Sequence, residues 1–260
     1  SRAEEEWATA EEMLQKSGDL KLLGVFLQQR AMIFSLLGDA EEALQGYRQA
    51  RLLCRRVGDA VGVAVALRGA ADVGVARGEV LSAELLFDQA DATQVPVVEL
   101  INRRLGQAGL AIAQGNWERA RTRLKEAEVL AGPEAMPILN ANVDLRTAQL
   151  CMMEGNLKEA LVAVDRAIHA YGSVGEFSAM ALALRLAGDC SWQTVGEDGA
   201  SSRYRKAIAL QIRMRDPKAL MTTLHHAGLF TRWVGDLQRA DALEILLDTL
   251  EDEVDPPRTQ

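Results

Sequence analysis

The chain has 260 residues, of which 48% are hydrophobic and 25% charged, and its formal net charge at pH 7 is −8. This acidity argues against a nucleic-acid surface, which needs clustered Lys and Arg to neutralise phosphates. No apolar run reaches the ~20 residues of a membrane-spanning helix, and no secretory signal is visible. Three cysteines without metal-ligand spacing, Cys54, Cys151 and Cys190, suit a reducing compartment, so we expect a cytoplasmic protein.

Helices are predicted along the whole chain. A single helix is expected near 3–16, and helix pairs follow near 20–56, 60–94, 97–131, 134–172, 176–214 and 217–252. No segment shows the alternation of a strand. The final residues, DEVDPPRTQ, predict a helix stop and a disordered tail over 253–260. We therefore expect one helical domain over residues 1–252.

An internal repeat organises these helices. Alanines recur at separations of 40, 37, 40, 40 and 40 residues, and large and small apolar residues follow most of them at four and seven positions. Spacing of i, i+4, i+7 marks one face of a helix, here one that packs closely against a neighbour. Another small residue lies twelve positions before each alanine, on the first helix of the pair. The repeat alanines are Ala43, Ala83, Ala120, Ala160, Ala200 and Ala240; the small residues of the first helices are Ala31, Ala71, Ala108, Ala148, Gly188 and Gly228.

The connections between paired helices also repeat. A glycine five positions before most repeat alanines suits the left-handed residue that ends a helix, and the following Asp or Asn suits the N-cap of the next. One unit lacks three residues between Ala90 and Ala108, so we expect a trimmed loop or helix end there. The period of these units is typical of a solenoid.

The order of small and large residues resembles the tetratricopeptide repeat over about Ala3 to Leu250. The usual unit of that family has about 34 residues. The longer unit here resembles the repeats of MalT-like transcription activators and of peptide-sensing bacterial regulators. The resemblance implies an all-α, right-handed solenoid of about six helix-turn-helix repeats plus a leading helix. HEAT-like repeats, which have a similar period but lack this residue order, are the second alternative.

No motif in the sequence assembles a catalytic or metal site. Phosphate-binding glycine loops are missing, and nothing combines a nucleophile, a base and an oxyanion site. His225 and His226 are adjacent on a predicted helix and point about 100° apart, so they cannot both face one metal ion. We therefore expect no enzyme activity, no cofactor and no metal.

In the family that the chain resembles, the first helices line a concave groove that binds the partner. Counted from each small residue, groove positions lie three before, one after and four after it, and positions six and two before add three more candidates. Four arginines against two aspartates, Asp72 and Asp189, predict an extended, neutral-to-acidic protein or peptide partner. The candidate groove residues are Arg68, Asn102, Asn142, Arg146, Gln149, Arg185, Trp192, His225 and Arg232.

Some groove residues carry more specific expectations. Arg68 and Arg185 each have an aspartate four residues on, which holds the guanidinium in place. Arg146 has no acid four residues on, and Arg146 and Arg232 are expected to be freer contacts. Trp192 is either an exposed anchor or a packing residue, whereas Trp7, Trp117 and Trp233 are expected in the core.

The sequence thus predicts a non-enzymatic interaction domain of a multidomain bacterial signalling or transcription regulator. One alternative is a sensor that binds a small peptide or metabolite, since Asn102 and Asn142 could clamp a backbone. The other is a self-assembly scaffold. The chain opens inside the second helix of a repeat, so we expect a fragment that self-associates through Trp7, Met13 and Leu14.

Overall fold

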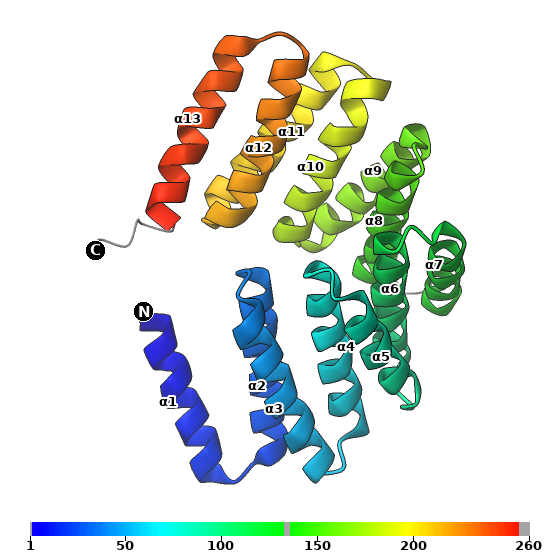
Figure 1. Ribbon diagram of the computed structural model, residues 1–260, viewed down its shortest axis with the longest axis vertical. Coiled ribbons are helices and arrows are strands. Elements are labelled where there is room, and N and C mark those ends of the chain that lie inside the picture. The colour runs from blue at the N-terminus through cyan, green and yellow to red at the C-terminus, as the bar shows by residue number, and fades with distance from the viewer. Residues whose placement is uncertain (1, 133–135, 255–260) are drawn as a thin grey trace. The chain divides into compact units, whose positions relative to one another are not determined.

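The computed structural model describes residues 2–132 and 136–254, with side chains within 5–132 and 136–250. All regular structure in these ranges is α-helical (Figure 1). The helices are α1 (Arg2–Ser17), α2 (Leu20–Leu36), α3 (Ala40–Arg56), α4 (Ala60–Ala76), α5 (Val80–Asp91), α6 (Val97–Ala113), α7 (Trp117–Ala131), α8 (Pro137–Met153), α9 (Leu157–Val174), α10 (Phe177–Thr194), α11 (Glu197–Met214), α12 (Pro217–Trp233) and α13 (Leu237–Val254). The predicted lone helix and six helix pairs are therefore confirmed.

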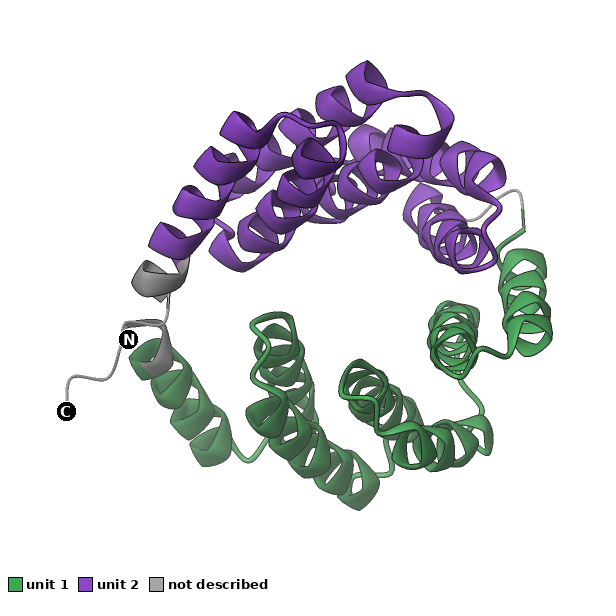
Figure 2. Ribbon diagram, turned by 45° about the horizontal axis from the view of Figure 1, so that its top comes forward, with its two compact units in different colours: residues 1–132 green, residues 133–260 purple. Residues whose placement is uncertain are grey.

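The chain divides into two compact units, Ser1–Gly132 and Pro133–Gln260 (Figure 2). Unit 1 contains α1 to α7 and unit 2 contains α8 to α13. Within each unit consecutive helices pack together, and successive first helices of the pairs also touch: α2, α4 and α6 in unit 1, and α8, α10 and α12 in unit 2. Such nearest-neighbour packing is that of an all-α solenoid. The single domain over 1–252 stays a prediction; α13 reaches Val254, and residues 255–260 of the predicted tail lie outside the described residues.

The repeat alanines are buried where helices pack together. All six are at most 1% exposed, and the small residues of the first helices from Ala31 to Ala148 are fully buried. The large residues between them fill the same seam: Tyr47, Phe87, Leu124, Val164 and Tyr204 are at most 7% exposed. Because a side chain larger than alanine would push the helices apart, this column fixes the register of the pairs.

The turns follow the predicted chemistry. Gly38 has φ of 79°, in the left-handed region that glycine enters without strain. Asp39 then caps α3, because its carboxylate accepts a hydrogen bond from the Glu42 amide at 3.4 Å. The same Gly-Asp or Gly-Asn turn precedes α2, α4 and α7. One left-handed residue among those described is not glycine: Arg215, with φ of 56°, ends α11.

The three missing residues shorten one helix. α5 has 12 residues, whereas the equivalent second helices α3 and α9 have 17 and 18. α5 ends at Asp91, and the chain reaches α6 through Pro96, which has an extended conformation with ψ of 152°. The predicted trimmed element is therefore the last turn of α5.

Candidate partner-binding faces

The first helices have one side that packs on the second helices and another that does not. The groove positions predicted from the sequence lie on this other side, which we call the first-helix face. Apolar side chains at such positions range from Leu105 at 7% exposed to Met32 at 45% and Leu229 at 49%, whereas Ala31 on the packing side is fully buried. Each unit has its own first-helix face.

In unit 1, Arg68 links two first helices. Its side chain projects from α4 and contacts the Asp72 carboxylate at 3.1 Å on the same helix, as the i, i+4 spacing predicted. Its Nε also donates a hydrogen bond to Glu99 Oε1 at 2.8 Å on α6, and Glu99 is buried. Burial alone would lower the pKa of Arg68, but the two carboxylates raise it above its ordinary value. Arg68 is therefore a charged tie between α4 and α6.

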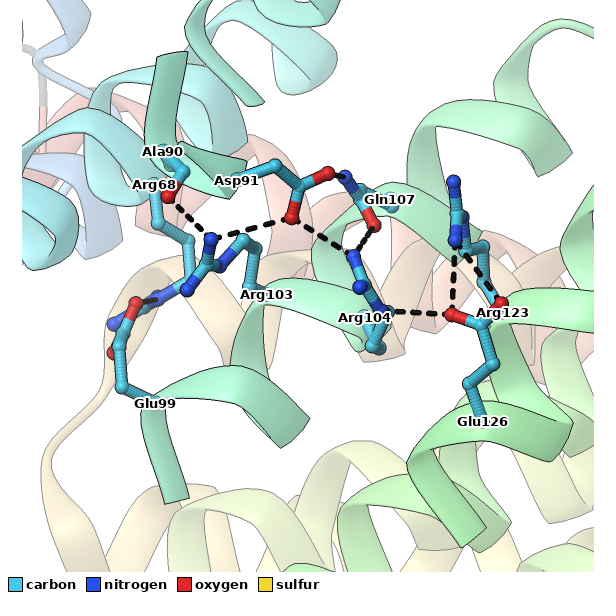
Figure 3. A network of polar contacts seen from close by, with 9 residues as sticks. All are labelled: Arg68, Ala90, Asp91, Glu99, Arg103, Arg104, Gln107, Arg123 and Glu126. Atoms are coloured by element: carbon cyan, nitrogen blue, oxygen red, sulfur yellow. Dashed lines mark hydrogen bonds and ion pairs between the residues drawn. The ribbon is translucent and has the colours of Figure 1, made fainter. Parts of the chain in front are cut away.

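A separate polar network spans α5, α6 and α7 (Figure 3). Asp91, at the end of α5, accepts from Arg104 at 2.9 Å and from Gln107 at 2.7 Å. Arg104 reaches Glu126 on α7 at 2.7 Å. Burial would raise the pKa of the Asp91 carboxyl, but Gln107 and the neighbouring guanidinium groups lower it overall. The network ties the shortened α5 to the next pair.

Arg103 is the buried member of this network, and sequence reasoning missed it. The residue is 1% exposed, and its guanidinium contacts the Ala90 carbonyl and the Asp91 carboxylate at the end of α5 (Figure 3). It stands five residues before Ala108, where other units have residues such as Ala66 and Val143. The guanidinium therefore caps the helix that lost its last turn. Its Nε and second amino nitrogen have no hydrogen-bond partner among the described residues.

In unit 2, Arg185 belongs to a cluster of four side chains on three helices. It contacts Asp189 on α10 at 3.0 Å and the His226 Nε2 on α12 at 3.2 Å. Asp189 also accepts from Tyr204 of α11 at 2.7 Å and from the His226 Nδ1 at 2.9 Å. Because a guanidinium only donates, these contacts fit the neutral imidazole with its proton on Nδ1. Burial, with the Asp189 carboxylate, raises the pKa of Tyr204 far above its ordinary value, so its hydroxyl stays a donor.

An aromatic stack lies at the C-terminal end of the same face. Trp192 is half-buried and stacks on Phe230 and on Trp233, with ring centroids 6.0 Å apart in both pairs. The prediction that Trp233 is a core residue is wrong: it is 65% exposed, because Phe230 and Val234 take the packing positions on either side of it. Trp7 and Trp117 are half-buried rather than fully enclosed, and Trp7 contacts Phe34 edge-on at 5.6 Å.

Asn142 and Arg146 are held by neighbours within unit 2. Asn142 accepts a hydrogen bond from the buried Tyr171 hydroxyl at 2.7 Å, so its carbonyl oxygen is engaged. Arg146 donates to Gln149 at 3.0 Å on α8. Asn102, on α6 in unit 1, is partly buried. The expectation that Asn102 and Asn142 act together stays a prediction, because they belong to different units.

Two further candidates lie on α12. His225 is exposed, and its ring centroid lies 6.1 Å from that of His226, nearly perpendicular to it. Arg232 is half exposed and forms an ion pair with Glu244 of α13. The expectation that Arg232 is a freer contact is therefore wrong: Asp236, four residues on, lies beyond the end of α12, and the acid that pairs with Arg232 is Glu244 of the next helix.

Within 5–132 and 136–250, no group of three His, Cys, Asp or Glu side chains is placed to hold a metal ion. Of the described helices, none is both long enough and apolar enough to span a membrane. Cys54, Cys151 and Cys190 are buried, and no disulfide joins them. Burial raises the pKa of the Cys190 thiol to about 12, which makes it unreactive near neutral pH.

Comparison with known proteins relates the chain to solved structures only. No protein-family profile matches the sequence, and no curated protein matches it. BtubC from P. vanneervenii is similar, with a TM-score of 0.65, 15% identity, and coverage of 87% of this chain and 93% of that chain. Aspartyl phosphate phosphatase F from Bacillus subtilis has a TM-score of 0.60 at 13% identity, over 92% of this chain and 73% of that chain.

A third similar structure is a signal transduction ATPase with numerous domains from Pyrococcus horikoshii, described as having a tetratricopeptide repeat sensor. Its TM-score is 0.74 at 14% identity, over 95% of this chain and 37% of that chain. The present chain therefore spans about a third of that protein. Identities this low establish the fold alone. The repeat columns, the helix pairs and these similarities agree, and the chain has a tetratricopeptide-repeat-like fold.

Proposed function

We propose that the chain is a non-enzymatic interaction domain and that the first-helix face of unit 2 binds a protein or peptide segment. The observation that carries this proposal is the exposed Trp233, stacked on Trp192 next to the Arg185 cluster. Exposed aromatic side chains beside hydrogen-bonding groups are typical of the central contacts of interfaces. The half-exposed Leu229 extends the apolar part of this face.

The partner would be extended and neutral to acidic. Arg146, Arg185 and Arg232 project from the first helices of unit 2, against the single groove aspartate Asp189. Glu244 and Asp189 compensate two of these arginines, so the face attracts acidic groups only moderately. We therefore expect aromatic and aliphatic contacts to contribute most of the affinity, and charge to contribute orientation.

The setting of the domain is part of the same proposal. The similarity to a signal transduction ATPase with a tetratricopeptide repeat sensor supports placing the chain in a multidomain cytoplasmic regulator. Because the repeat domain of that protein is described as a sensor, the similarity also supports a second candidate function, in which the face binds a small peptide or metabolite. Self-assembly through Trp7, Met13 and Leu14 remains a separate prediction; Met13 is 67% exposed, whereas Leu14 packs on the core of unit 1.

Selection of binders from a displayed library of random peptides, with the full chain as bait, tests this function. Calorimetry with the selected peptide would then compare Trp233→Ala with Ile212→Ala, which removes a similarly exposed apolar side chain from α11. We expect at least a tenfold loss for the first variant and less than a twofold change for the second. Failure to select any peptide, or equal losses in both variants, would contradict the proposal.

Charge reversal gives a second, independent comparison. Arg146→Glu places an acid on the first-helix face of unit 2, whereas Glu159→Lys reverses an exposed charge on α9. A neutral-to-acidic partner should lose several-fold affinity in the first variant only. A sensor for a neutral metabolite would bind its small ligand without any dependence on these charges.

A further inference from the structure

One ion pair in each unit joins two consecutive second helices. Asp165 of α9 accepts from Arg203 of α11 at 3.0 Å, and Glu84 of α5 accepts from Arg119 of α7 at 2.6 Å. Counted from the repeat alanines, Glu84 and Arg119 lie one position after and one before, and Asp165 and Arg203 lie five and three positions after. The two pairs are therefore about one helical turn apart in the repeat, and each closes the gap between adjacent second helices.

Two other gaps have no acid at these positions. Between α3 and α5 the equivalent residues are Leu44 with Ser82 and Arg48 with Leu86; between α11 and α13 they are Ser201 with Arg239 and Arg205 with Leu243. A cavity opens at each of these gaps, lined by the same repeat positions. We call the cavity between α11 and α13 the outer slot; it lies over α12, on the side away from the first-helix face.

The two cavities differ in size. The outer slot has a volume of about 460 Å³, whereas the cavity between α3 and α5 has about 200 Å³. Sites for small ligands and side-chain groups usually begin near ~300 Å³, so only the outer slot is large enough. One cause lies in the sequence, because Leu44 in unit 1 stands where unit 2 has Ser201.

The outer slot combines an apolar floor with a basic rim. Tyr204, Phe230 and Ala227 form the floor and are at most 5% exposed. At the rim, Arg205 is exposed and donates to the Ser201 carbonyl at 3.2 Å. Among the described residues the structure pairs Arg205 with no carboxylate, although the same repeat position in α9 carries the paired Asp165.

The remaining charges at the rim make the two ends of the slot electrostatically different. Arg239, 71% exposed, is paired only loosely with Asp236 at 3.3 Å on its own helix. Glu197 and Asp198 line the end of the slot where α11 begins. An acidic group entering the slot is therefore repelled at that end and attracted toward Arg205.

We propose that the outer slot is a second docking site, which takes a polypeptide segment with an aromatic or aliphatic side chain next to a carboxylate. The apolar side chain would lie on Tyr204 and Phe230, and the carboxylate would pair with Arg205. The carboxylate of the occupant would thereby form, with Arg205, an ion pair at the gap between α11 and α13. This site is on the opposite side of α12 from the face proposed above and does not depend on that face binding anything.

A pair of matched dipeptides tests the proposal. N-acetyl-phenylalanyl-glutamyl amide and its glutaminyl counterpart would be titrated to about 10 mM into the 15N-labelled full chain, with amide shifts followed by NMR. We expect the glutamyl peptide to shift resonances of α11, α12 and α13, and to bind about three- to tenfold more tightly than the glutaminyl peptide. Absence of such shifts, or equal affinities, would overturn the proposal.

Three variants separate charge from shape. Arg205→Gln should remove the preference for the glutamyl peptide, and Ser201→Leu should abolish binding of both peptides by filling the slot as Leu44 does in unit 1. Arg48→Gln changes the equivalent arginine of unit 1 and should alter neither affinity. Unchanged binding in Ser201→Leu would place the peptides elsewhere. Sedimentation provides a further check: a dimer that becomes monomeric in Ser201→Leu would assign the slot to a second copy of the chain and contradict the proposal.

Discussion

Each unit contains an arginine with an aspartate four residues on, and the units differ in the third group that contacts this arginine. Arg68 in unit 1 lies between Asp72 and the buried Glu99, so the cluster has one positive and two negative charges. Arg185 in unit 2 lies between Asp189 and the imidazole of His226, so the charges balance when the imidazole is neutral. Both pairs join first helices, since Arg68 reaches Glu99 of α6 and Arg185 reaches His226 of α12. The unit 2 pair is the less exposed, with Arg185 and Asp189 at 13% and 12%, so His226, 35% exposed, is the part of that cluster that another molecule can contact.

Tyrosines at one repeat position extend this comparison. Tyr47 of unit 1 and Tyr204 of unit 2 both stand four residues after a repeat alanine, and both are buried. Both rings lie tightly over a glycine of the first helix, Tyr47 over Gly69 and Tyr204 over Gly188, and the Tyr204 hydroxyl also donates to Asp189. Burial raises the pKa of Tyr47 to about 12. The same residue therefore serves packing in both units, and in unit 2 it also orients the polar cluster.

The largest expected effect separates the two arginine clusters. Glu99→Gln should lower the free energy of unfolding by about 2–3 kcal/mol, because it removes a buried charged hydrogen bond from Arg68. The matched change in unit 2, His226→Gln, should cost less than about 1 kcal/mol, since the half-exposed imidazole is replaced by another polar group. Urea denaturation of both variants measures the difference. Equal losses would mean that the clusters do not differ in structural role.

A smaller effect is expected where tyrosine rings cover glycines. A methyl group at Gly69 would lie 2.4 Å from the Tyr47 ring, and one at Gly188 would lie 2.8 Å from the Tyr204 ring. Gly69→Ala and Gly188→Ala should therefore each cost about 1–3 kcal/mol, the former more. Gly228→Ala, in the same column as Gly188 but with no atom within 4 Å, should instead stabilise by about 0.5–1 kcal/mol. Thermal melting that ranks Gly228→Ala with the other two would disprove this packing.

The smallest effect concerns the thiols, one in unit 1 and two in unit 2. Burial raises the pKa of Cys54 as well as that of Cys190, and all three cysteines are buried. A disulfide reagent such as 5,5′-dithiobis(2-nitrobenzoate) at pH 8 should therefore label the folded chain at least tenfold more slowly than the chain in guanidinium chloride. Rapid labelling of one thiol in the folded chain would reveal a locally open helix pair.

The sequence predicted what depends on spacing along one helix. The alanine period located the helices, and the i, i+4 rule placed Arg68 with Asp72 and Arg185 with Asp189. The contacts it missed join distant residues: Arg68 with Glu99, and Asp189 with His226, 31 and 37 positions apart. Those pairs depend on how the helices rotate against one another, which a repeat period does not specify. A hint existed for Tyr204, since a buried tyrosine hydroxyl usually needs a partner.

The repeat pattern could not predict the contacts of Arg103 either. Its position in other units carries residues such as Ala66 and Val143, which predicts an apolar contact there. Only the missing last turn of α5 creates a helix end that the guanidinium can reach. The deletion could be seen in the sequence, but the role of Arg103 at the end of the shortened helix could not.

The four tryptophans provide the most direct test that the first-helix face of unit 2 binds the partner. Trp192 and Trp233 lie at the end of that face, whereas Trp7 and Trp117 belong to unit 1. The indole N–H signals in a 15N spectrum, assigned by single Trp→Phe substitutions, would be followed as a selected peptide is added. We predict that the Trp192 and Trp233 signals shift while those of Trp7 and Trp117 stay in place. Shifts at Trp7 or Trp117 with unchanged Trp192 and Trp233 would contradict the account.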